Sequence, residues 1–224
     1  MTTLGIKRFD PSTISPNSKI LVIGPKGSGK STIAKDVAYR NRGKFHNGVC
    51  MGAEHQTCKL ESFLPLPRMH TEFSGTALET VLAQGTGESD PKHVYVILED
   101  VAFDHVTMRG EAMRQALASP HAFLLHTMQY LYKSLKEWRR YDYIVVTRPH
   151  LNDDNLYRCF GDRFWDFDTF TRVVNENTQG YNCVVFNLGS QSNKIEDTVF
   201  YYKADLDPSQ PLSGSDIVGP GHTQ

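Results

Sequence analysis

Short apolar runs alternate with helical patterns along most of this chain. Each apolar run is continuous, rich in β-branched or aromatic residues and bounded by turn or polar residues, which is typical of buried strands. Such runs predict strands at residues 19–23, 48–52, 94–98, 122–126, 143–147, 183–186 and 198–202. Apolar residues at helical spacing predict helices at 30–40, near 75–83, at 108–118 and around 165–175.

The order of these elements predicts the fold class. Strands that alternate with helices form a mostly parallel sheet with helices on both faces. The runs at 183–186 and 198–202 are joined by a turn at Gly189–Asn193, so we expect them to close the sheet as an antiparallel pair. A chain of 224 residues is expected to form one domain, which we place at 1–206. Residues 207–224 are rich in Pro, Gly and Ser and predict a flexible C-terminal tail.

A glycine-rich segment links the first strand to the first helix. Gly24 to Ser31 reads Gly-Pro-Lys-Gly-Ser-Gly-Lys-Ser and matches the P-loop pattern GxxxxGK[ST] at every fixed position. Glycines let the backbone curl until its N–H groups point at phosphate oxygens, and the helix N-terminus adds a positive end. In this pattern Lys30 reaches the β- and γ-phosphates, and the Ser31 hydroxyl binds Mg²⁺. The sequence therefore predicts a nucleoside triphosphate site made of Gly24, Pro25, Lys26, Gly27, Ser28, Gly29, Lys30, Ser31 and Thr32.

Two acidic residues end the strand at 94–98. Glu99 and Asp100 occupy the position of a Walker B pair, in which one carboxylate holds Mg²⁺, usually through water, and the other activates the attacking water. Neighbouring residues at a strand end face different directions, as two separate roles require. By position we assign Glu99 to the metal and Asp100 to water activation, and the exchanged assignment stays open.

A polar residue follows the next strand. Gln129 lies just beyond the run at 122–126, where its side chain could touch the γ-phosphate or the attacking water, or could simply cap a turn. The order of P-loop strand, acid-tipped strand and polar-tipped strand favours an ATPase with an additional strand in the middle of the sheet. It disfavours a small-molecule kinase.

The composition limits how this protein can bind nucleic acid. With 39% hydrophobic and 22% charged residues and a formal net charge of -1, it is an ordinary globular protein. A chain that coats nucleic acid over its whole surface would be more basic. Contact with DNA must therefore come from a local patch or from several subunits together. The segment 132–141 interleaves bases with aromatic residues and could be a subunit interface, a helix with solvated charges or a DNA contact.

Cysteine use and hydropathy indicate an intracellular protein. Cys50, Cys58, Cys159 and Cys183 form no CxxC pair and are typical of reduced thiols. Cys50, His55 and Cys58 lie close enough to suggest zinc ligands, but no fourth partner follows at a finger-like spacing. The first residues lack the apolar stretch of a signal peptide, and no apolar run approaches the roughly 20 residues that span a bilayer. We therefore expect no membrane partner.

With its motifs in this order, the chain resembles the genome-packaging ATPases of nucleocytoplasmic large DNA viruses, in the HerA/FtsK branch of P-loop ATPases. The resemblance runs from Phe9-Asp-Pro11 to about Lys203-Ala204. Besides the P-loop, it rests on Ile97-Leu-Glu-Asp100, Met128-Gln-Tyr130, Asp142–Arg148, Ser192–Asp197 and Phe200–Ala204. It implies a RecA-like α/β P-loop NTPase fold of the ASCE type, and a motor that uses ATP and Mg²⁺ to drive double-stranded DNA into a preformed capsid.

The resemblance also implies partners and further site residues. The active protein would be a homo-oligomeric ring that meets capsid portal or vertex components, in the host-cell viral factory or on the virion. Lys30 and Ser31 carry over as Walker A residues and Gln129 as the polar sensor. The family usually has two aspartates or Asp-Glu at Glu99-Asp100, and an arginine within the segment 116–121, where this chain has none. Candidates for an arginine that acts on a neighbour's ATP are Arg109, Arg114, Arg139, Arg140 and Arg148, of which Arg148 and Arg114 match family positions best. Either could instead bind a carboxylate inside its own subunit.

Two other functions fit parts of the sequence. A P-loop phosphotransferase acting on a small substrate would work as a monomer and close several arginines on the phosphates, for which Arg109 and Arg114 could serve. The acid pair and Gln129 would then have no role. A nucleotide-dependent switch would hydrolyse slowly and act through its conformation. The residues themselves do not separate ATP from GTP, because a P-loop contacts phosphates and not the base.

Overall fold

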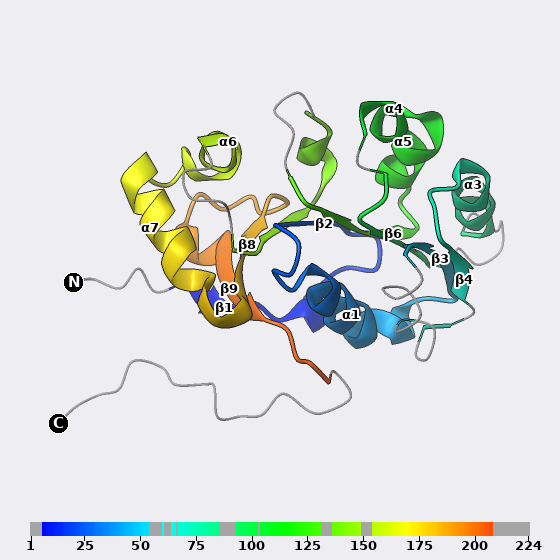
Figure 1. The fold of residues 1–224 in the computed structure, drawn as a ribbon, viewed down its shortest axis with the longest axis horizontal. Coiled ribbons are helices and arrows are strands. Elements are labelled where there is room, and N and C mark those ends of the chain that lie inside the picture. The colour runs from blue at the N-terminus through cyan, green and yellow to red at the C-terminus, as the bar shows by residue number, and fades with distance from the viewer. Residues whose placement is uncertain are drawn as a thin grey trace.

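A nine-stranded sheet organises the part of the chain that this computed structural model describes, which is residues 6–53, 60, 64–65, 67–85, 93–102, 104–130, 136–148 and 154–207. The strands are β1 (Lys7–Arg8), β2 (Lys19–Ile23), β3 (Asn47–Gly52), β4 (Pro67–His70), β5 (Val94–Glu99), β6 (Ala122–Met128), β7 (Tyr143–Val146), β8 (Asn182–Asn187) and β9 (Val199–Lys203). Their order in the sheet is β1-β9-β8-β7-β2-β6-β5-β3-β4 (Figure 1). The strand before the P-loop, β2, therefore lies in the middle, and β6 separates it from β5.

The strand directions bring many loops to one edge of the sheet. The strands from β7 to β4 in this order all run parallel, whereas β8 is antiparallel to both β7 and β9. β9 therefore runs the same way as β7, and β1 pairs parallel with it. The carboxyl ends of β2, β5, β6, β7 and β9 and the amino end of β8 all meet at one edge, here called the C-terminal edge.

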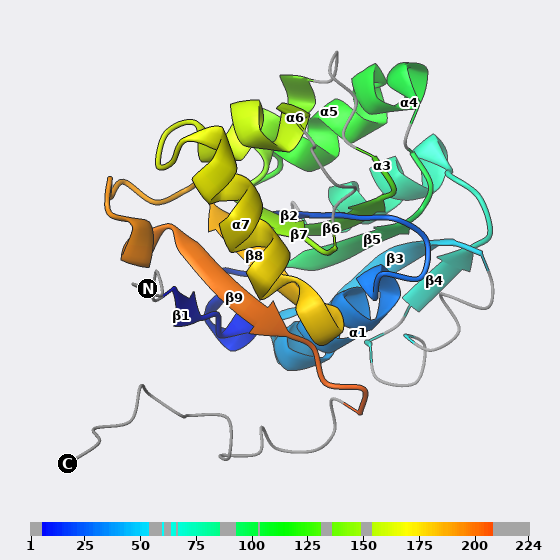
Figure 2. The same cartoon turned by 60° about the vertical axis from the view of Figure 1, so that its left-hand side comes forward.

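Helices cover both faces of the sheet. They are α1 (Lys30–Asn41), α3 (Gly75–Gln84), α4 (His105–Arg109), α5 (Glu111–Ala118), α6 (Asp154–Leu156) and α7 (Phe167–Asn177). Short 3-10 or π-helical turns lie at Pro11–Thr13, Arg42–Lys44, Lys136–Arg140, Tyr157–Gly161, Gln179–Tyr181 and Ile195–Asp197. Figures 1 and 2 show α1 on one face of the sheet and α3, α4 and α5 on the other.

Alternate residues of the strands pack into two cores, one on each face. The core on the α1 face includes Val22, Ile33 and Phe123. The core on the opposite face includes Leu21 of β2 and Met113 of α5. Because the central strands are buried on both sides, their sequences are continuous apolar runs instead of alternating ones.

The structure confirms the predicted α/β class and its strands. Every strand expected from the sequence is present, with ends that shift by one or two residues, and β8 and β9 are antiparallel as expected. The single helix expected at 108–118 is wrong, because that segment forms α4 and α5, which meet at Gly110. Gly110 has φ -60° and ψ 154°, outside the helical range. Glycine is a poor residue for continuing a helix, so the break falls there.

Some elements have no signal in the sequence pattern. β1 has only two residues, and β4 begins at Pro67, a residue that sheets tolerate at an edge or at the first position of a strand. The turn expected at Gly189–Asn193 is part of a longer connection that also contains the 3-10 turn Ile195–Asp197.

Several predictions fall where the structure gives no description. The tail beyond Asp207 and two of the three zinc candidates, His55 and Cys58, lie outside the described residues. Cys50, Cys159 and Cys183 carry free thiols. No helix among the described residues is long and apolar enough to cross a membrane.

Candidate nucleotide-binding site

The segment between β2 and α1 curls around the amino end of the helix. The Gly24 amide donates to the Met128 carbonyl at 3.1 Å, which ties the start of the loop to the end of β6. Gly27 and Gly29 have φ values of 80° and 94°, a left-handed conformation that glycine adopts at little cost. Gly29 is the N-cap of α1 and has no side chain to cap it. The first N–H groups of the helix therefore remain available to phosphate oxygens.

Thr147, which follows β7, holds the P-loop from its other side. Its hydroxyl donates to the Ile23 carbonyl at 3.2 Å and lies 2.6 Å from the Ser28 hydroxyl. A Cβ atom on Gly24 would lie 1.6 Å from the Thr147 hydroxyl oxygen. Only glycine fits at position 24 for this reason, which comes from β7 and not from phosphate binding.

The structure brings the P-loop lysine together with the second acid of the pair. Lys30 Nζ lies 3.6 Å from Asp100 Oδ2 and donates to the Pro25 carbonyl at 3.3 Å. The Lys30 side chain is 5% exposed and that of Asp100 is 23% exposed. Charges this shielded from water attract each other more strongly than an exposed surface pair.

A cavity of about 640 Å³ opens beside these residues. Its volume lies within the range of small-molecule sites in proteins, about 300–1,000 Å³. It is lined by Lys26, Gly27, Gly29, Lys30, Ser31, Thr32, Ile33, Asp100, Gly180, Tyr181, Lys203, Ala204 and Leu206. Most of the predicted P-loop residues and Asp100 therefore share one cavity with residues of the turn before β8 and of the end of β9 and the segment after it.

A sharp turn after β5 points Asp100 toward the P-loop. Asp100 has φ 50°, a left-handed conformation that is uncommon for residues other than glycine. Its amide donates to the Thr127 hydroxyl at 3.0 Å, which holds the turn in place. Its Oδ1 atom is buried and accepts no hydrogen bond from the described residues. Strain and an unused buried acceptor at one residue are features of functional sites.

Glu99, the last residue of β5, is 2% exposed. By the alternation of the strand it shares the α1 face of the sheet with Tyr95 and Ile97. Burial, with the Glu99 charge as a second cause, raises the pKa of the neighbouring Cys50 thiol. Unlike Asp100, Glu99 is not among the residues that line the cavity. The structure therefore brings Asp100, and not Glu99, into the cavity with the P-loop.

His126 supports the turn that carries Asp100, although nothing in the sequence marked it. Its buried ring lies with Nε2 3.0 Å from the Val101 carbonyl and Nδ1 2.9 Å from the Tyr141 hydroxyl. Burial lowers the pKa of His126 to about 4, so the ring is neutral near pH 7. A carbonyl can only accept, so Nε2 carries the proton and Nδ1 accepts from Tyr141.

Gln129 and Arg148 lie directly beyond β6 and β7 at the C-terminal edge. Each follows a residue that contacts the P-loop, Met128 and Thr147 respectively. Both side chains are exposed, and neither is among the residues lining the cavity. The structure therefore places them beside the P-loop without bringing either side chain into the cavity.

The arginines of α4 and α5 lie on the face of the sheet opposite α1. Arg109 pairs with Glu137 at 3.3 Å, and Arg114 pairs with Glu111 at 2.6 Å. Each thus binds a carboxylate of its own subunit, which is the alternative that the sequence left open for Arg114. None of the candidate arginines lines the cavity. They are Arg109, Arg114, Arg139, Arg140 and Arg148.

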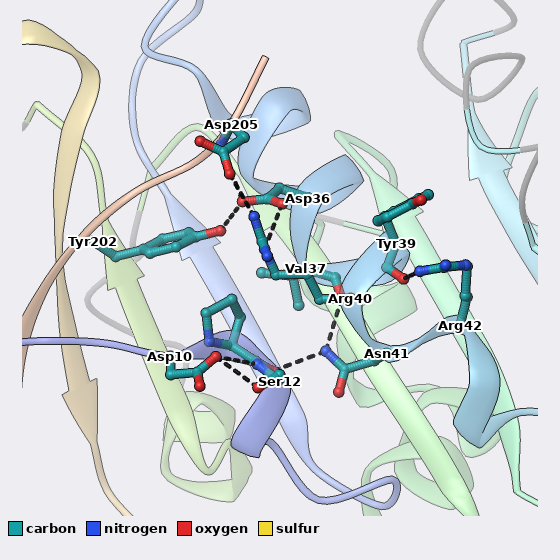
Figure 3. A network of polar contacts seen from close by, with 11 residues as sticks. Asp10, Ser12, Asp36, Val37, Tyr39, Arg40, Asn41, Arg42, Tyr202 and Asp205 are labelled. Carbon is teal, nitrogen blue, oxygen red and sulfur yellow. Dashed lines mark hydrogen bonds and ion pairs between the residues drawn. The ribbon is translucent and has the colours of Figure 1, made fainter. Parts of the chain in front are cut away.

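A polar network fixes the segment after β9 to the helix that follows the P-loop (Figure 3). Asp36 of α1 is 0% exposed and accepts from Arg40 Nε at 2.8 Å, from the Asp205 amide at 3.1 Å and from the Tyr202 hydroxyl. Arg40 also pairs with the Asp205 carboxylate. These bonds hold Lys203, Ala204 and Leu206, the far wall of the cavity, against α1. Lys203 and Ala204 end a segment that carries the resemblance, Phe200–Ala204, but nothing in the sequence placed that segment at the cavity, because its position depends on the return of β9 to the C-terminal edge.

Comparison with known proteins gives distant relatives. No family model matches the chain. A protein of Invertebrate iridescent virus 3, "Uncharacterized protein 088R", is 24% identical over 92% of this chain and 87% of its own length. "Uncharacterized protein L437" of Acanthamoeba polyphaga mimivirus is 23% identical over 89% of this chain and 77% of its own length. Both relatives are proteins of large DNA viruses.

A solved structure shares the fold. It is the genome packaging NTPase B204 from Sulfolobus turreted icosahedral virus 2, in complex with ATP-gammaS. The two chains superpose with a TM-score of 0.57 at 12% sequence identity, over 86% of this chain and 100% of that one. At this identity the likeness concerns the fold alone. The chain has the α/β fold of P-loop NTPases.

Proposed function

We propose that this protein is an ATP-hydrolysing motor that moves double-stranded DNA, and that its task is to package a viral genome into a preformed capsid. One observation carries the proposal. Asp100 approaches Lys30 to 3.6 Å although β6 separates β5 from the P-loop strand. Two strand spacings put the backbones of β5 and β2 roughly 10 Å apart, and the side chains of Lys30 and Asp100 close this gap. A γ-phosphate and an attacking water would enter between the two side chains by separating the pair.

The residues of the cavity suit a triphosphate with Mg²⁺. Mg²⁺ prefers oxygen ligands, and inside the cavity the Ser31 hydroxyl and the Asp100 carboxylate offer them. Glu99 does not line the cavity, so it would hold the ion through water. When bound, the ion would neutralise charge on the phosphates during transfer. We assign Glu99 to the metal, Asp100 to the attacking water and Gln129 to sensing the γ-phosphate.

The contacts of two arginines argue against the phosphotransferase alternative. That function needs arginines that close on the phosphates, but Arg109 and Arg114 pair with Glu137 and Glu111 on the other face of the sheet. It also gives no role to Asp100 at the tip of β5. The observations therefore favour an ATPase with a catalytic acid.

The DNA, ring and capsid parts of the proposal rest on similarity and charge. B204 is a genome packaging NTPase, and the two relatives in sequence belong to large DNA viruses. A net charge of -1 is compatible with DNA binding when a ring of subunits turns its lysine and arginine side chains inward. In such a ring Arg148 or Arg114, both exposed, would act on the ATP of a neighbouring subunit. Portal or vertex components of the capsid would then be its partners, in the viral factory or on the virion.

The test is the steady-state ATPase rate per subunit as a function of protein concentration, with and without double-stranded DNA. Lys30→Ala serves as the control for contaminating ATPases. An assembling motor gives a rate that rises with concentration and with DNA. A rate that is independent of both would contradict the motor and favour the switch or the phosphotransferase, and a Lys30→Ala variant as active as the wild type would contradict the P-loop assignment itself.

A further inference from the structure

The cavity extends from the P-loop toward β8 and β9. In the sheet, β5 with Asp100 lies on one side of β2, and β8 and β9 lie on the other. Lys30 and Asp100 mark the end of the cavity where the γ-phosphate would lie. The walls made by Gly180, Tyr181, Lys203, Ala204 and Leu206 adjoin β8 and β9, on the other side of β2 from β5. A nucleotide on the P-loop would therefore direct its base toward them.

We infer that Tyr181 and Leu206 form the subsite for the nucleobase, in which the Tyr181 ring stacks on the base. This inference rests on the proposed function, because it presupposes a nucleotide on the P-loop. The β8–β9 register pairs Asn182 with Lys203, so Tyr181 and the residues after Lys203 leave the sheet side by side. The two walls of the subsite are thus neighbours at the C-terminal edge.

The exposure of these two side chains supports a planar apolar ligand. Tyr181 is 71% exposed and Leu206 is 86% exposed, and both line the same cavity. Covering them removes apolar surface from water, which is favourable. An aromatic ring can stack on any nucleobase, because every base has a π-face.

The backbone of Tyr181 is held in an unfavourable conformation. Gly180 and Tyr181 have φ values of 60° and 65°, and the second is costly for a bulky side chain. Such strain persists where the surrounding structure imposes it, and it is found at ligand sites. Here it puts the ring beside the P-loop, since a Cβ on Gly29 would lie 3.5 Å from Tyr181 Cδ1.

The wall made by Lys203, Ala204 and Leu206 is held in place by hydrogen bonds to Asp36 of α1. Tyr202 and Asp205 flank Lys203 and Ala204, and both bind Asp36 of α1. The helix that begins at the phosphate site is therefore fixed to the wall of the base site (Figure 3). A base and its phosphates would be held by one connected unit.

The test compares ATP with inorganic tripolyphosphate, which occupies the phosphate site but has no base. Binding of each would be measured by calorimetry for wild type, Tyr181→Gly and Tyr181→Phe. Glycine suits φ 65°, so Tyr181→Gly removes the ring while relieving the strain, and folding is not at risk. We expect ATP to bind about ten-fold or more weakly to Tyr181→Gly, tripolyphosphate to bind unchanged, and Tyr181→Phe to behave as wild type.

Two further variants separate the possible failures. Val106→Ala truncates another exposed apolar side chain, 84% exposed, on α4 outside the cavity and should leave both affinities unchanged. Lys30→Ala should weaken both ligands, and if it weakens neither, the P-loop assignment fails. If Lys30→Ala behaves as expected but Tyr181→Gly changes ATP and tripolyphosphate equally, or changes neither, the base subsite is wrong while the proposed function stands.

Discussion

The Lys30 ammonium and the Asp100 carboxylate lie 3.6 Å apart, so charged groups from the P-loop and from the tip of β5 meet in one cavity. Asn in place of Asp100 keeps the shape of the side chain but removes the charge that would orient and deprotonate water. We expect Asp100→Asn to bind ATP with near wild-type affinity and to lose turnover about 100-fold or more. Single-turnover hydrolysis and equilibrium nucleotide binding would separate the two effects.

Glu99→Gln is the comparison that assigns the two acids. If Glu99 holds the metal, Glu99→Gln should raise the Mg²⁺ concentration needed for half-maximal activity, while the rate at saturating Mg²⁺ changes less. If Glu99→Gln abolishes turnover at saturating Mg²⁺ while Asp100→Asn stays active, the roles are exchanged.

An arginine supplied by a neighbour predicts complementation between inactive variants. Arg148→Ala keeps its own P-loop, and Lys30→Ala keeps its own Arg148. If Arg148 acts on the next subunit, each variant alone should be inactive, and an equal mixture should regain a measurable part of the wild-type rate at mixed interfaces. The same mixture with Arg114→Ala tests the second candidate.

The outcome depends on which arginine, if either, crosses the interface. Recovery with Arg148→Ala and not with Arg114→Ala assigns Arg148. A mixture whose rate equals the sum of its parts in both cases would contradict an arginine acting between subunits, and would leave these side chains with roles inside their own chain, as the Arg114–Glu111 pair indicates for Arg114.

The sequence predicted the sheet well because each central strand is buried on both faces. A continuous apolar run such as Val94–Leu98 can hardly be anything but an interior strand, and the P-loop between 19–23 and 30–40 identified the connection. The middle position of β6 followed from the order of motifs, and the structure has β6 between β2 and β5.

The far half of the cavity was not predictable in the same way. Tyr181 and Leu206 belong to no motif, and they reach the P-loop only because β8 reverses direction and β9 reverses it again. The support from Thr147 and His126 is also invisible in the sequence, since each acts through one hydrogen-bonded contact between distant segments. A local pattern carries no information about such contacts.

Gly24 should resist even the smallest substitution because of Thr147. A Cβ at Gly24 would lie 1.6 Å from the Thr147 hydroxyl oxygen and 2.8 Å from the Ser28 hydroxyl oxygen. We expect Gly24→Ala to lower the free energy of unfolding by about 1–3 kcal/mol, as overpacking does, and to weaken nucleotide binding. Gly43→Ala is the matched control, because a Cβ there has no atom within 4 Å. Equal urea midpoints for the two variants would show that Thr147 moves aside freely.

Loss of the buried Asp36 should destabilise the fold more than loss of an aspartate from an exposed i,i+4 ion pair. It accepts from Arg40, Tyr202 and the Asp205 amide while fully buried, so Asp36→Ala leaves several polar groups without their partner. We expect a loss of about 3 kcal/mol in the free energy of unfolding. Asp154→Ala breaks another i,i+4 pair with arginine, Asp154–Arg158, whose side chains are 48% and 72% exposed, and should cost less than about 1 kcal/mol. Similar losses of unfolding free energy in the two variants would mean that the bonds from Tyr202 and the Asp205 amide add nothing to the Asp36–Arg40 pair.

His126 should make the protein less stable in mild acid. Its pKa is lowered by burial to about 4 in the folded chain, whereas the ordinary value is 6.5. Below pH 6.5 His126 is protonated in the unfolded chain, whereas in the folded chain it stays neutral down to about pH 4. The contribution of His126 to the free energy of unfolding is therefore fully present above pH 6.5 and is lost as the pH falls toward 4. Between pH 7 and pH 5 the loss from this residue should be about 2 kcal/mol.

A neutral replacement isolates that contribution from the other histidines. Near pH 5 only the wild type takes up a proton at residue 126 when it unfolds. The slope of the free energy of unfolding against pH should therefore be shallower in His126→Gln, by the amount that corresponds to about one proton. Parallel slopes would contradict a neutral buried ring. If the variant does not fold, an NMR titration of His126 in the wild type decides the same question. The His126 resonance should stay unchanged down to about pH 5. A midpoint near 6.5 would show that the contacts to Val101 and Tyr141 do not exclude the proton.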